Sequence, residues 1–260
     1  MDELQKVALE AALKAGKILK ENIGKNFSVS YKSDKNLVTD VDKLAEKTIL
    51  GIIKERFPAH SILTEEKGEE SKRSPFKWII DPLDGTTNYA HGFRIFCVSI
   101  GIEKDGEVIL GVVYDPANEE LFTATKNGGA YLNNIKISVS SISSIADSLL
   151  ATGFPYDIKK NPNNNFDNFK NFAFRAQAIR RAGSAALDLC YVACGRFDGF
   201  WESGLNPWDV AAGSLIVAEA GGFVSDFSGK EFSIHKKETL ASNGKIHQEM
   251  VNILSLQREK

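Results

Sequence analysis

The sequence predicts an α+β fold, a sandwich in which helices and mostly antiparallel strands are packed in layers. Apolar residues at helical spacing alternate with short apolar runs of strand length along the chain. Between residues 95 and 140 the pattern changes to strands joined by turns, which indicates an antiparallel meander. A chain of 260 residues with 43% apolar content can bury a large core. We therefore expect one compact unit of two halves, residues 1–143 and 144–260.

In the first half, two helices precede most of the strands. The first is expected to end at Gly24, and the second to begin at Thr39 or Asp40 and to end before Pro58. Apolar spacing predicts buried faces made of Val7, Leu9, Leu13, Ile18 and Leu19 on the first helix, and of Val41, Leu44, Ile49, Ile52 and Ile53 on the second. Strands are predicted at residues 27–32, 61–64 and 78–80, with a charged loop at 65–75.

A hairpin that turns at Asp105-Gly106 opens the meander, and residues 141–146 are expected to join the two halves. In the second half, strands are predicted at residues 149–154, 197–203 and 239–243. Helices are predicted at residues 166–176, 183–195 and 207–222, and from residue 245 onward. The two glycines at 221 and 222 are expected to stop the third of these helices.

Composition and charge argue against several classes of protein. A net charge of −2 without a long basic run gives no sign of a nucleic-acid partner, and no segment has the ~18 apolar residues needed to cross a membrane. The N-terminal segment carries charges throughout, unlike a signal peptide. The four histidines are scattered, which argues against a zinc site, and Cys97, Cys190 and Cys194 form neither an even disulfide set nor a CxxC pair. A reducing cytoplasm fits these features.

The segment WIIDPLDGTTN, residues 78–88, carries the first functional signal, because a short apolar run ends there in two aspartates. Pro82 cannot donate a hydrogen bond to a sheet, so the strand is expected to end there with Asp81 facing the space above its edge. Asp84 is expected to cap a helix that begins at Thr86. The N–H groups of a helix start favour phosphate, and paired carboxylates in a cleft favour a hard cation such as Mg²⁺. An Asp-rich turn with an ordinary helix cap is the alternative.

Two further segments bring acids to the ends of elements. Glu65 and Glu66 follow the predicted strand at 61–64, and Asp209 lies in the first turn of the predicted helix at 207–222. Taken singly, the two glutamates could be a solvated charge run, and Asp209 could compensate the helix dipole. Acids at three element ends together favour a metal cluster.

These motifs resemble the signatures of the inositol monophosphatase family, which comprises Mg²⁺-dependent, lithium-sensitive phosphomonoesterases related to fructose-1,6-bisphosphatase. The resemblance rests on DPLDGTTN at 81–88, TEE at 64–66 and WDVAAGSLIVAEAGG at 208–222, and the order of elements matches over essentially the whole chain. It implies a layered αβαβα sandwich of the sugar phosphatase type. It also implies a cytoplasmic homodimer that hydrolyses inositol monophosphate to inositol and phosphate.

By this resemblance, Glu65, Asp81 and the backbone carbonyl of Leu83 would bind a first Mg²⁺. Asp81, Asp84 and Asp209 would bind a second, and Glu65 would reach a third ion through water. Two Mg²⁺ ions would neutralise the four carboxylates before a phosphate dianion binds.

The family pattern also implies catalytic and substrate-binding residues. The expected catalytic residues are Glu65, Thr86 and Asp81, with Thr86 coupled to Glu65 so that the pair orients a water and takes its proton. The N–H groups of Gly85 and Thr86 would hold phosphate oxygens, and Glu202 would accept a hydrogen bond from a ring hydroxyl. The full set expected to contact the substrate is Gly85, Thr86, Gly183, Ser184, Ala185, Glu202, Asp209 and Arg181.

The roles of several other residues stay open in the sequence. Arg180 and Arg181 could pair with a phosphate or lie at a subunit interface. Lys32 and the residues that follow it, 33–37, resemble a mobile flap that helps to place the third metal, or form an ordinary solvated loop. Asp40 and Asp42 are expected to be a helix cap and a surface acid, with a peripheral metal role as the alternative.

Other functions also stay open. Phosphatases that form an aspartyl-phosphate share the string DGT, but they need two aspartates separated by one residue, whereas two residues separate Asp81 from Asp84. A non-catalytic metal- or phosphate-binding module is a remote alternative, since EF-hand spacing is absent. Within the family, a fructose-1,6-bisphosphatase or a dual-activity enzyme is the main alternative, because the paired arginines leave room for a second phosphate.

Overall fold

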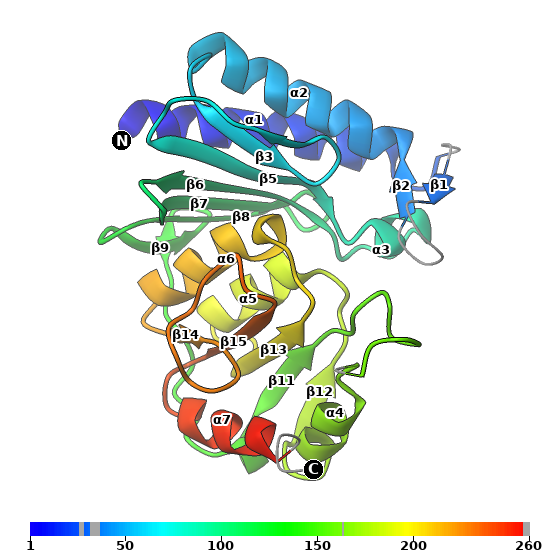
Figure 1. Ribbon diagram of the computed structural model, residues 1–260, viewed down its shortest axis with the longest axis vertical. Helices are drawn as coiled ribbons and strands as arrows, with labels where there is room; N and C mark the ends of the chain where they lie inside the picture. Colours follow the sequence, from blue (N-terminus) through cyan, green and yellow to red (C-terminus); the bar gives the residue numbers. More distant parts are fainter. Residues whose placement is uncertain (26–28, 32–36, 163, 257–260) are drawn as a thin grey trace.

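The computed structural model describes residues 1–25, 29–31, 37–162 and 164–256, so the predicted flap at Lys32 lies outside the described residues. Figure 1 shows successive layers: helices α1 (Asp2–Asn22) and α2 (Asp40–Arg56), a first sheet, helices α5 (Ala185–Ala193) and α6 (Pro207–Glu219), a second sheet, and helices α4 (Phe166–Ala173) and α7 (His247–Ser255). A small antiparallel pair, β1 (Val29–Tyr31) and β2 (Leu37–Thr39), precedes α2. The predicted αβαβα sandwich is confirmed.

The outer helices α1 and α2 are packed through small side chains. Residues of α1 without exposed surface are Ala8, Ala11, Ala12, Ala15 and Leu19. Leu13 and Leu44, both predicted to face inward, are 43% and 47% exposed, so the prediction is wrong for them. On α1 the alanines form the contact face in place of Leu13. On α2 the buried face takes in Asp42 and Glu46, and this orientation leaves Leu44 outside.

The first sheet has eight strands in the order β10, β9, β8, β7, β6, β5, β3, β4, and β3 and β5 pair in parallel. Its strands are β3 (Ser61–Thr64), β4 (Gly68–Glu70), β5 (Phe76–Asp84), β6 (Cys97–Lys104), β7 (Glu107–Asp115), β8 (Glu120–Thr125), β9 (Gly129–Leu132) and β10 (Ile135–Lys136). The predicted hairpin turns at Asp105 and Gly106, both with positive φ. The prediction of a loop at 65–75 is wrong where β4 forms, because the exposed residues of β4 carry no apolar pattern.

β5 continues past Pro82, contrary to the prediction that it ends there. Asp81 pairs with Ser99 and Asp84 pairs with Cys97, so three steps along β5 oppose two steps along β6. Such a bulge accommodates a proline, because the extra residue leaves a position that donates no ladder hydrogen bond. The bulge therefore sets Asp84, rather than Asp81, at the last position of the strand.

The second sheet has five strands in the order β12, β11, β13, β15, β14, with both parallel and antiparallel pairs. Its strands are β11 (Leu149–Thr152), β12 (Ala178–Arg180), β13 (Gly199–Ser203), β14 (Phe223–Ser225) and β15 (Glu238–Ser242). The short β12 was not predicted, since three partly exposed residues give no clear period. A short 3-10 helix, Ile145–Asp147, lies in the segment predicted to join the halves.

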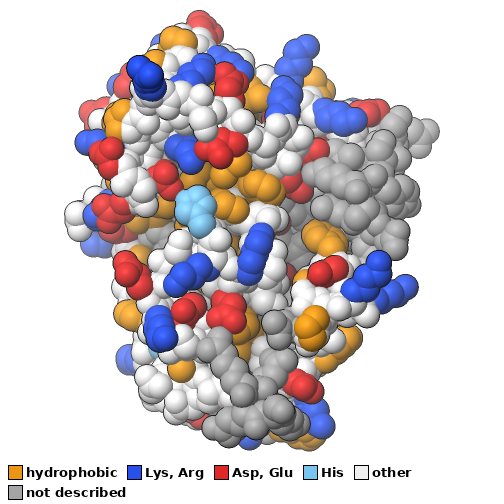
Figure 2. Space-filling model, viewed as in Figure 1, with side chains coloured by type: hydrophobic (Ala, Val, Ile, Leu, Met, Phe, Trp, Pro, Cys, Tyr) orange, Lys and Arg blue, Asp and Glu red, His pale blue; other side chains and the backbone are white. Residues whose placement is uncertain are grey.

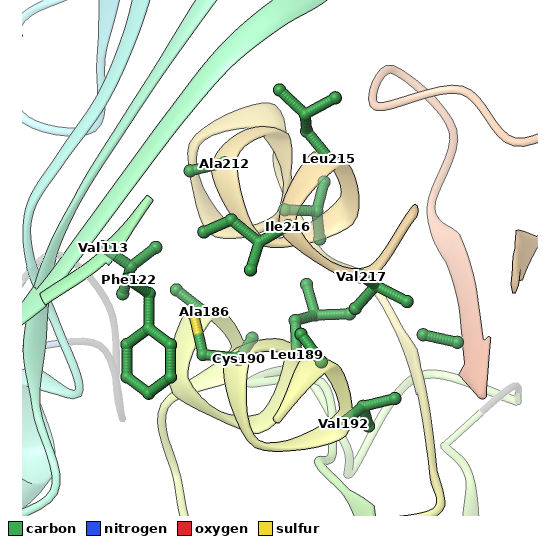
Figure 3. Packing of buried hydrophobic residues seen from close by; sticks show 14 of the residues in the cluster. Val113, Phe122, Ala186, Leu189, Cys190, Val192, Ala212, Leu215, Ile216 and Val217 are labelled. Carbon is green, nitrogen blue, oxygen red and sulfur yellow. The ribbon is translucent and has the colours of Figure 1, made fainter. Parts of the chain in front are cut away.

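The middle helix α6 approaches the first sheet where two glycines leave room for it. A Cβ on Gly101 would lie 2.8 Å from the Cβ of Ala211, and one on Gly111 would lie 2.7 Å from the carbonyl oxygen of Ala212. Figure 3 shows side chains of α5, α6 and the first sheet gathered in one core, among them Val113, Phe122, Ala186, Leu189, Cys190, Ala212 and Ile216. Both predicted halves contribute to this core, and the division between residues 143 and 144 stays a prediction.

The surface carries charges of both signs. Figure 2 shows Lys and Arg side chains interspersed with Asp and Glu over the described part of one face, without a continuous basic patch there. None of the helices formed by the described residues has the length and apolar character needed to cross a membrane.

Candidate active site

Most of the predicted site residues gather around one pocket with a volume of about 100 Å³. The wall includes the end of β5, the segment after β11, the end of β13 and the starts of α5 and α6. Residues of the wall include Asp84, Gly153, Arg181, Gly183, Ser184, Ala185, Asp188, Glu202 and Asp209. Arg180 is not part of this wall, and its guanidinium donates to the carbonyl oxygen of Ile179 at 3.2 Å. The sequence thus brings together Asp84, Asp209, Glu202 and Arg181 from distant segments.

Asp81 is buried next to the pocket, at the bulge of β5. Its Oδ1 accepts a hydrogen bond from the backbone N–H of Leu83 at 2.9 Å. Burial raises the pKa of Asp81 well above its usual range, and the charges of Glu65, Asp84 and Asp209 raise it further. These four acids therefore lie close enough to repel one another when they are ionised.

Asp84 caps a different helix from the predicted one. Its Oδ2 accepts hydrogen bonds from Ser184 Oγ at 2.7 Å and from the backbone N–H of Ala186 at 2.8 Å, at the start of α5. The N-cap of the short helix α3 (Thr86–Ala90) is Gly85, in the left-handed region with φ 92°. Glycine is required at this position, because a Cβ would lie 2.8 Å from the carbonyl oxygen of Ile95. Burial raises the pKa of Asp84 to about 6, although the Ser184 hydrogen bond opposes the shift.

Asp209 lies in the first turn of α6 and serves as part of its N-terminal cap. Its Oδ2 accepts a hydrogen bond from the backbone N–H of Asn206 at 2.7 Å. The backbone carbonyl of Trp208 accepts from Ser99 Oγ at 3.2 Å, which fixes the start of α6 above β6. Burial and then the charge of Asp84 raise the pKa of Asp209 well above its usual range. Asp209 thus lies both in the first turn of α6, where its charge can compensate the helix dipole, and beside the other acids.

Glu65 follows β3 and is partly buried, and its backbone N–H donates to the carbonyl oxygen of Ile80 on β5 at 3.3 Å. Its charge contributes to the raised pKa values of Asp81, Asp84 and Asp209. This glutamate is therefore part of the acid cluster rather than of a solvated charge run.

The hydroxyl of Thr86 has two acceptors within reach. Thr86 Oγ1 lies 3.0 Å from the carbonyl oxygen of Leu83 and 3.3 Å from Oδ1 of Asp42. The prediction of Asp42 as a surface acid is wrong: the residue is fully buried, and its Oδ2 accepts from the backbone N–H of Thr39 at 2.9 Å. Burial raises the pKa of Asp42. Its sequence signal was the capping spacing from Thr39 to Asp42, which explains a helix start but says nothing about Thr86.

The other side of the pocket carries the predicted substrate contacts. Gly183, with φ 89°, connects β12 to α5, and the side-chain N–H of Asn88 donates to the carbonyl of Ala182 at 2.8 Å, which ties this turn to α3. Glu202 lies against Gly153, where a Cβ would stand 2.1 Å from its carboxyl oxygens. Burial raises the pKa of Glu202 to about 8, and the charge of Arg181 opposes this shift. Glu202 is thus not a surface acid.

The acid cluster suits a hard cation by the chemistry of its donors. In the part of the chain that the structure describes, no Lys, Arg or His forms an ion pair with Asp81, Asp84 or Asp209. Among the same residues, no three acidic, histidine or cysteine side chains already enclose a space for an ion. Carboxylate oxygens are ligands that Mg²⁺ prefers. The residues therefore fit a divalent ion, with side-chain rotation needed to bind it.

Comparisons with known proteins agree over the length of the chain. The model of the inositol monophosphatase family matches residues 1–259. An inositol-1-monophosphatase of Synechocystis sp. is 48% identical over 251 residues, which cover 96% of this chain and 88% of the relative. A Nus factor SuhB of Pseudomonas aeruginosa is 43% identical over 94% of this chain and 93% of its own length. The solved structure of an inositol monophosphatase from Anabaena (Nostoc) sp. matches with a TM-score of 0.90 and 43% identity, over 98% of this chain and 96% of that one.

Proposed function

Since the chain belongs to the inositol monophosphatase family, whose members are phosphatases that hydrolyse phosphomonoesters, we propose that it is a Mg²⁺-dependent phosphatase that converts inositol monophosphate to inositol and phosphate. The observation that carries the proposal is the gathering of Asp81, Asp84, Asp209 and Glu65 beside one pocket, where the charges of Glu65, Asp84 and Asp209 add to the raised pKa of Asp81. A cluster of this kind has little structural use without cations, because its mutual repulsion destabilises the fold.

The metal-binding residues follow from this cluster. Glu65, Asp81 and the carbonyl of Leu83 would hold one Mg²⁺, and Asp81, Asp84 and Asp209 a second, with a third ion near Glu65 as a further proposal. Bound ions would neutralise the charge of the phosphate and lower the pKa of a bound water. The carbonyl oxygen of Leu83 accepts from Thr86 Oγ1 at 3.0 Å, and its second lone pair leaves it able to bind a metal ion as well. Asp42, at 3.3 Å, is the second acceptor to which that hydroxyl can turn.

The protein residues then orient the reactants. Thr86 would hold the attacking water through its hydroxyl, and Glu65 would accept the proton that the water loses. The start of α3, with the N–H groups of Gly85 and Thr86, would bind phosphate oxygens. Catalysis would come mainly from positioning and charge stabilisation, as phosphoryl transfer requires.

Inositol monophosphate is favoured as substrate by the second side of the pocket. Glu202 offers carboxyl oxygens to ring hydroxyls, and Gly183, Ser184 and Ala185 lie along the same wall. Fructose 1,6-bisphosphate is the alternative; only one of the two arginines, Arg181, lines the pocket, which weakens the case for a second phosphate there. A homodimer in the cytoplasm and inhibition by lithium are further parts of the proposal.

Relatives of comparable identity are named Nus factor SuhB, so a role as a Nus factor is a second candidate function. It would not exclude the phosphatase activity. Loss of such a role in a variant that keeps full phosphatase activity would separate the two functions.

Phosphate release from inositol 1-phosphate, measured with saturating Mg²⁺ and with excess chelator, tests the proposal. We expect turnover only with the metal ion. A panel with fructose 1,6-bisphosphate then ranks substrates by kcat/KM. A tenfold preference for fructose bisphosphate would overturn the substrate, and absence of turnover on all phosphomonoesters would overturn the function.

A further inference from the structure

The pocket wall contains one more acid, Asp188, that takes no part in the chemistry proposed above. Asp188 lies in the first turn of α5, one turn after Ser184, and it is only 1% exposed. It lines the same pocket as Glu202 and Asp209. A charged residue within the otherwise apolar sequence AALDLCYVA is unusual for a buried helix, and this was its signal in the sequence.

Asp188 has no hydrogen-bond donor to its side chain among the described residues. Its Oδ1 is buried without a partner, and no described residue donates to its side chain. Asp115, another buried acid, is satisfied: it accepts from the backbone N–H groups of Ala117 and Asn118 and from the Asn118 side chain, at 2.8 to 3.1 Å. A buried acceptor without a donor costs about 1–3 kcal/mol. Because Asp188 lines the pocket, a hydroxyl group bound there can supply a hydrogen-bond donor to its carboxyl group.

Asp188 and Glu202 form a pair of acids in the pocket wall. Burial raises the pKa of Asp188 well above its usual range, the charge of Glu202 raises it further, and the charge of Arg181 opposes the shift. Arg181 is exposed and forms no ion pair within 4.0 Å with either acid among the described residues. The carboxyl oxygens of Glu202 lie close to Gly153, where the absence of a side chain leaves room for them in the pocket wall.

The chemistry of this pair selects one part of a phosphomonoester. A phosphomonoester dianion has no hydrogen to donate to these two carboxyl groups, whereas ring hydroxyl groups can donate hydrogen bonds to them. The phosphate would therefore lie at the Asp84 and Asp209 side, and the polyol at the Asp188 and Glu202 side. We propose that Asp188 is a specificity-determining residue that accepts a hydrogen bond from one hydroxyl of the substrate's polyol ring while Glu202 accepts from another. This inference rests on the proposed function.

The test compares a substrate that has ring hydroxyls, inositol 1-phosphate, with one that lacks them, phenyl phosphate. In Asp188→Ala we expect the ratio of kcat/KM for inositol 1-phosphate to that for phenyl phosphate to fall at least tenfold. Asp188→Asn keeps one accepting oxygen, so its ratio of the two kcat/KM values should lie between those of the wild type and the alanine variant. The matched control is Asp115→Ala, another buried acid, which should keep the wild-type ratio.

Melting temperatures provide the second readout. Asp115→Ala removes satisfied hydrogen bonds and should melt lower than the wild type, whereas Asp188→Ala removes an unsatisfied acid and should melt close to the wild type. An unchanged substrate ratio in Asp188→Ala, or melting as low as in the control, would overturn the inference while leaving the proposed function intact. A wild-type protein that hydrolyses neither ester would instead overturn the proposed function, and this inference with it.

Discussion

Replacement of Asp84 by asparagine is expected to stabilise the metal-free protein and to abolish most of its activity. The fold should tolerate the change, because an asparagine oxygen can accept the hydrogen bonds that Ser184 Oγ and the Ala186 N–H donate to Asp84. What the variant loses is a negative charge among Asp81, Asp209 and Glu65.

The size of the stabilisation follows from the pKa of Asp84. Burial raises it from 3.8 to about 6, a shift of about 2 units, which corresponds to about 3 kcal/mol for keeping this carboxylate ionised at pH 8. Asparagine does not carry this cost, so the chelated variant should melt roughly 6 °C higher than the chelated wild type. With Mg²⁺ the order should reverse, because the variant has lost a ligand. Its kcat/KM should fall on the order of 10²- to 10³-fold.

The assay is thermal unfolding at pH 8, with excess chelator and with saturating Mg²⁺, together with phosphate release. Asp105→Asn is the matched control, since Asp105 lies in a hairpin turn with φ 51°, a conformation that asparagine adopts readily. This control should match the wild type in both measurements. Asp84→Asn with near-normal turnover, or with no gain in melting temperature under chelation, would refute the reasoning.

Three further predictions concern pH, the Thr86 hydroxyl and the packing of α6. The raised pKa values mean that the folded, metal-free protein holds protons that the unfolded chain releases. This contribution to stability is complete below about pH 4 and is lost as the pH rises through about 6 for Asp84 and about 8 for Glu202. The melting temperature of the protein in excess chelator should therefore decrease as the pH rises from about 5 to about 9. A melting temperature that does not change over this range would contradict the prediction. Asp42→Asn should lower kcat about tenfold with little change in melting, because Thr86 loses a charged acceptor at 3.3 Å; unchanged kcat would exclude that role. Gly111→Ala places a Cβ 2.7 Å from the carbonyl of Ala212 and should cost about 1–3 kcal/mol. Its control is Gly51→Ala, in open space on α2, which should stabilise by up to about 1 kcal/mol. Equal melting temperatures of the two glycine variants would contradict close packing of α6 against Gly111.

The layered fold and the acid cluster were predictable because each depends on local signals that recur along the chain. Helical spacing located the helices, an acid directly after an apolar run located Glu65 and Asp81, and an acid in the first turn of an apolar helix located Asp209. Contacts between segments that are distant in the chain could not be predicted from these local signals. Asp84 accepts a hydrogen bond at the start of α5, about one hundred residues away in the chain, and does not cap the helix that follows it.

The same reason explains the errors on the helices. Leu13 and Leu44 fit an apolar stripe, yet the packing uses alanines on α1 and admits Asp42 and Glu46 on α2. Pro82 suggested the end of a strand, since proline cannot donate a ladder hydrogen bond. The bulge that accommodates it depends on the pairing with β6, which the sequence of β5 alone does not show. Asp188 was visible as an acid in an apolar helix, but its lack of a protein donor is a property of the folded pocket.

Crystals grown with Mn²⁺ in place of Mg²⁺ would test the central claim most directly, since anomalous scattering locates the ion without ambiguity. We expect peaks bounded by the carboxylates of Asp81, Asp84 and Asp209, with Glu65 at the edge of the cluster. Crystals that contain Mn²⁺ in solution but show no peak among these carboxylates would contradict the metal site, and the proposed phosphatase mechanism with it.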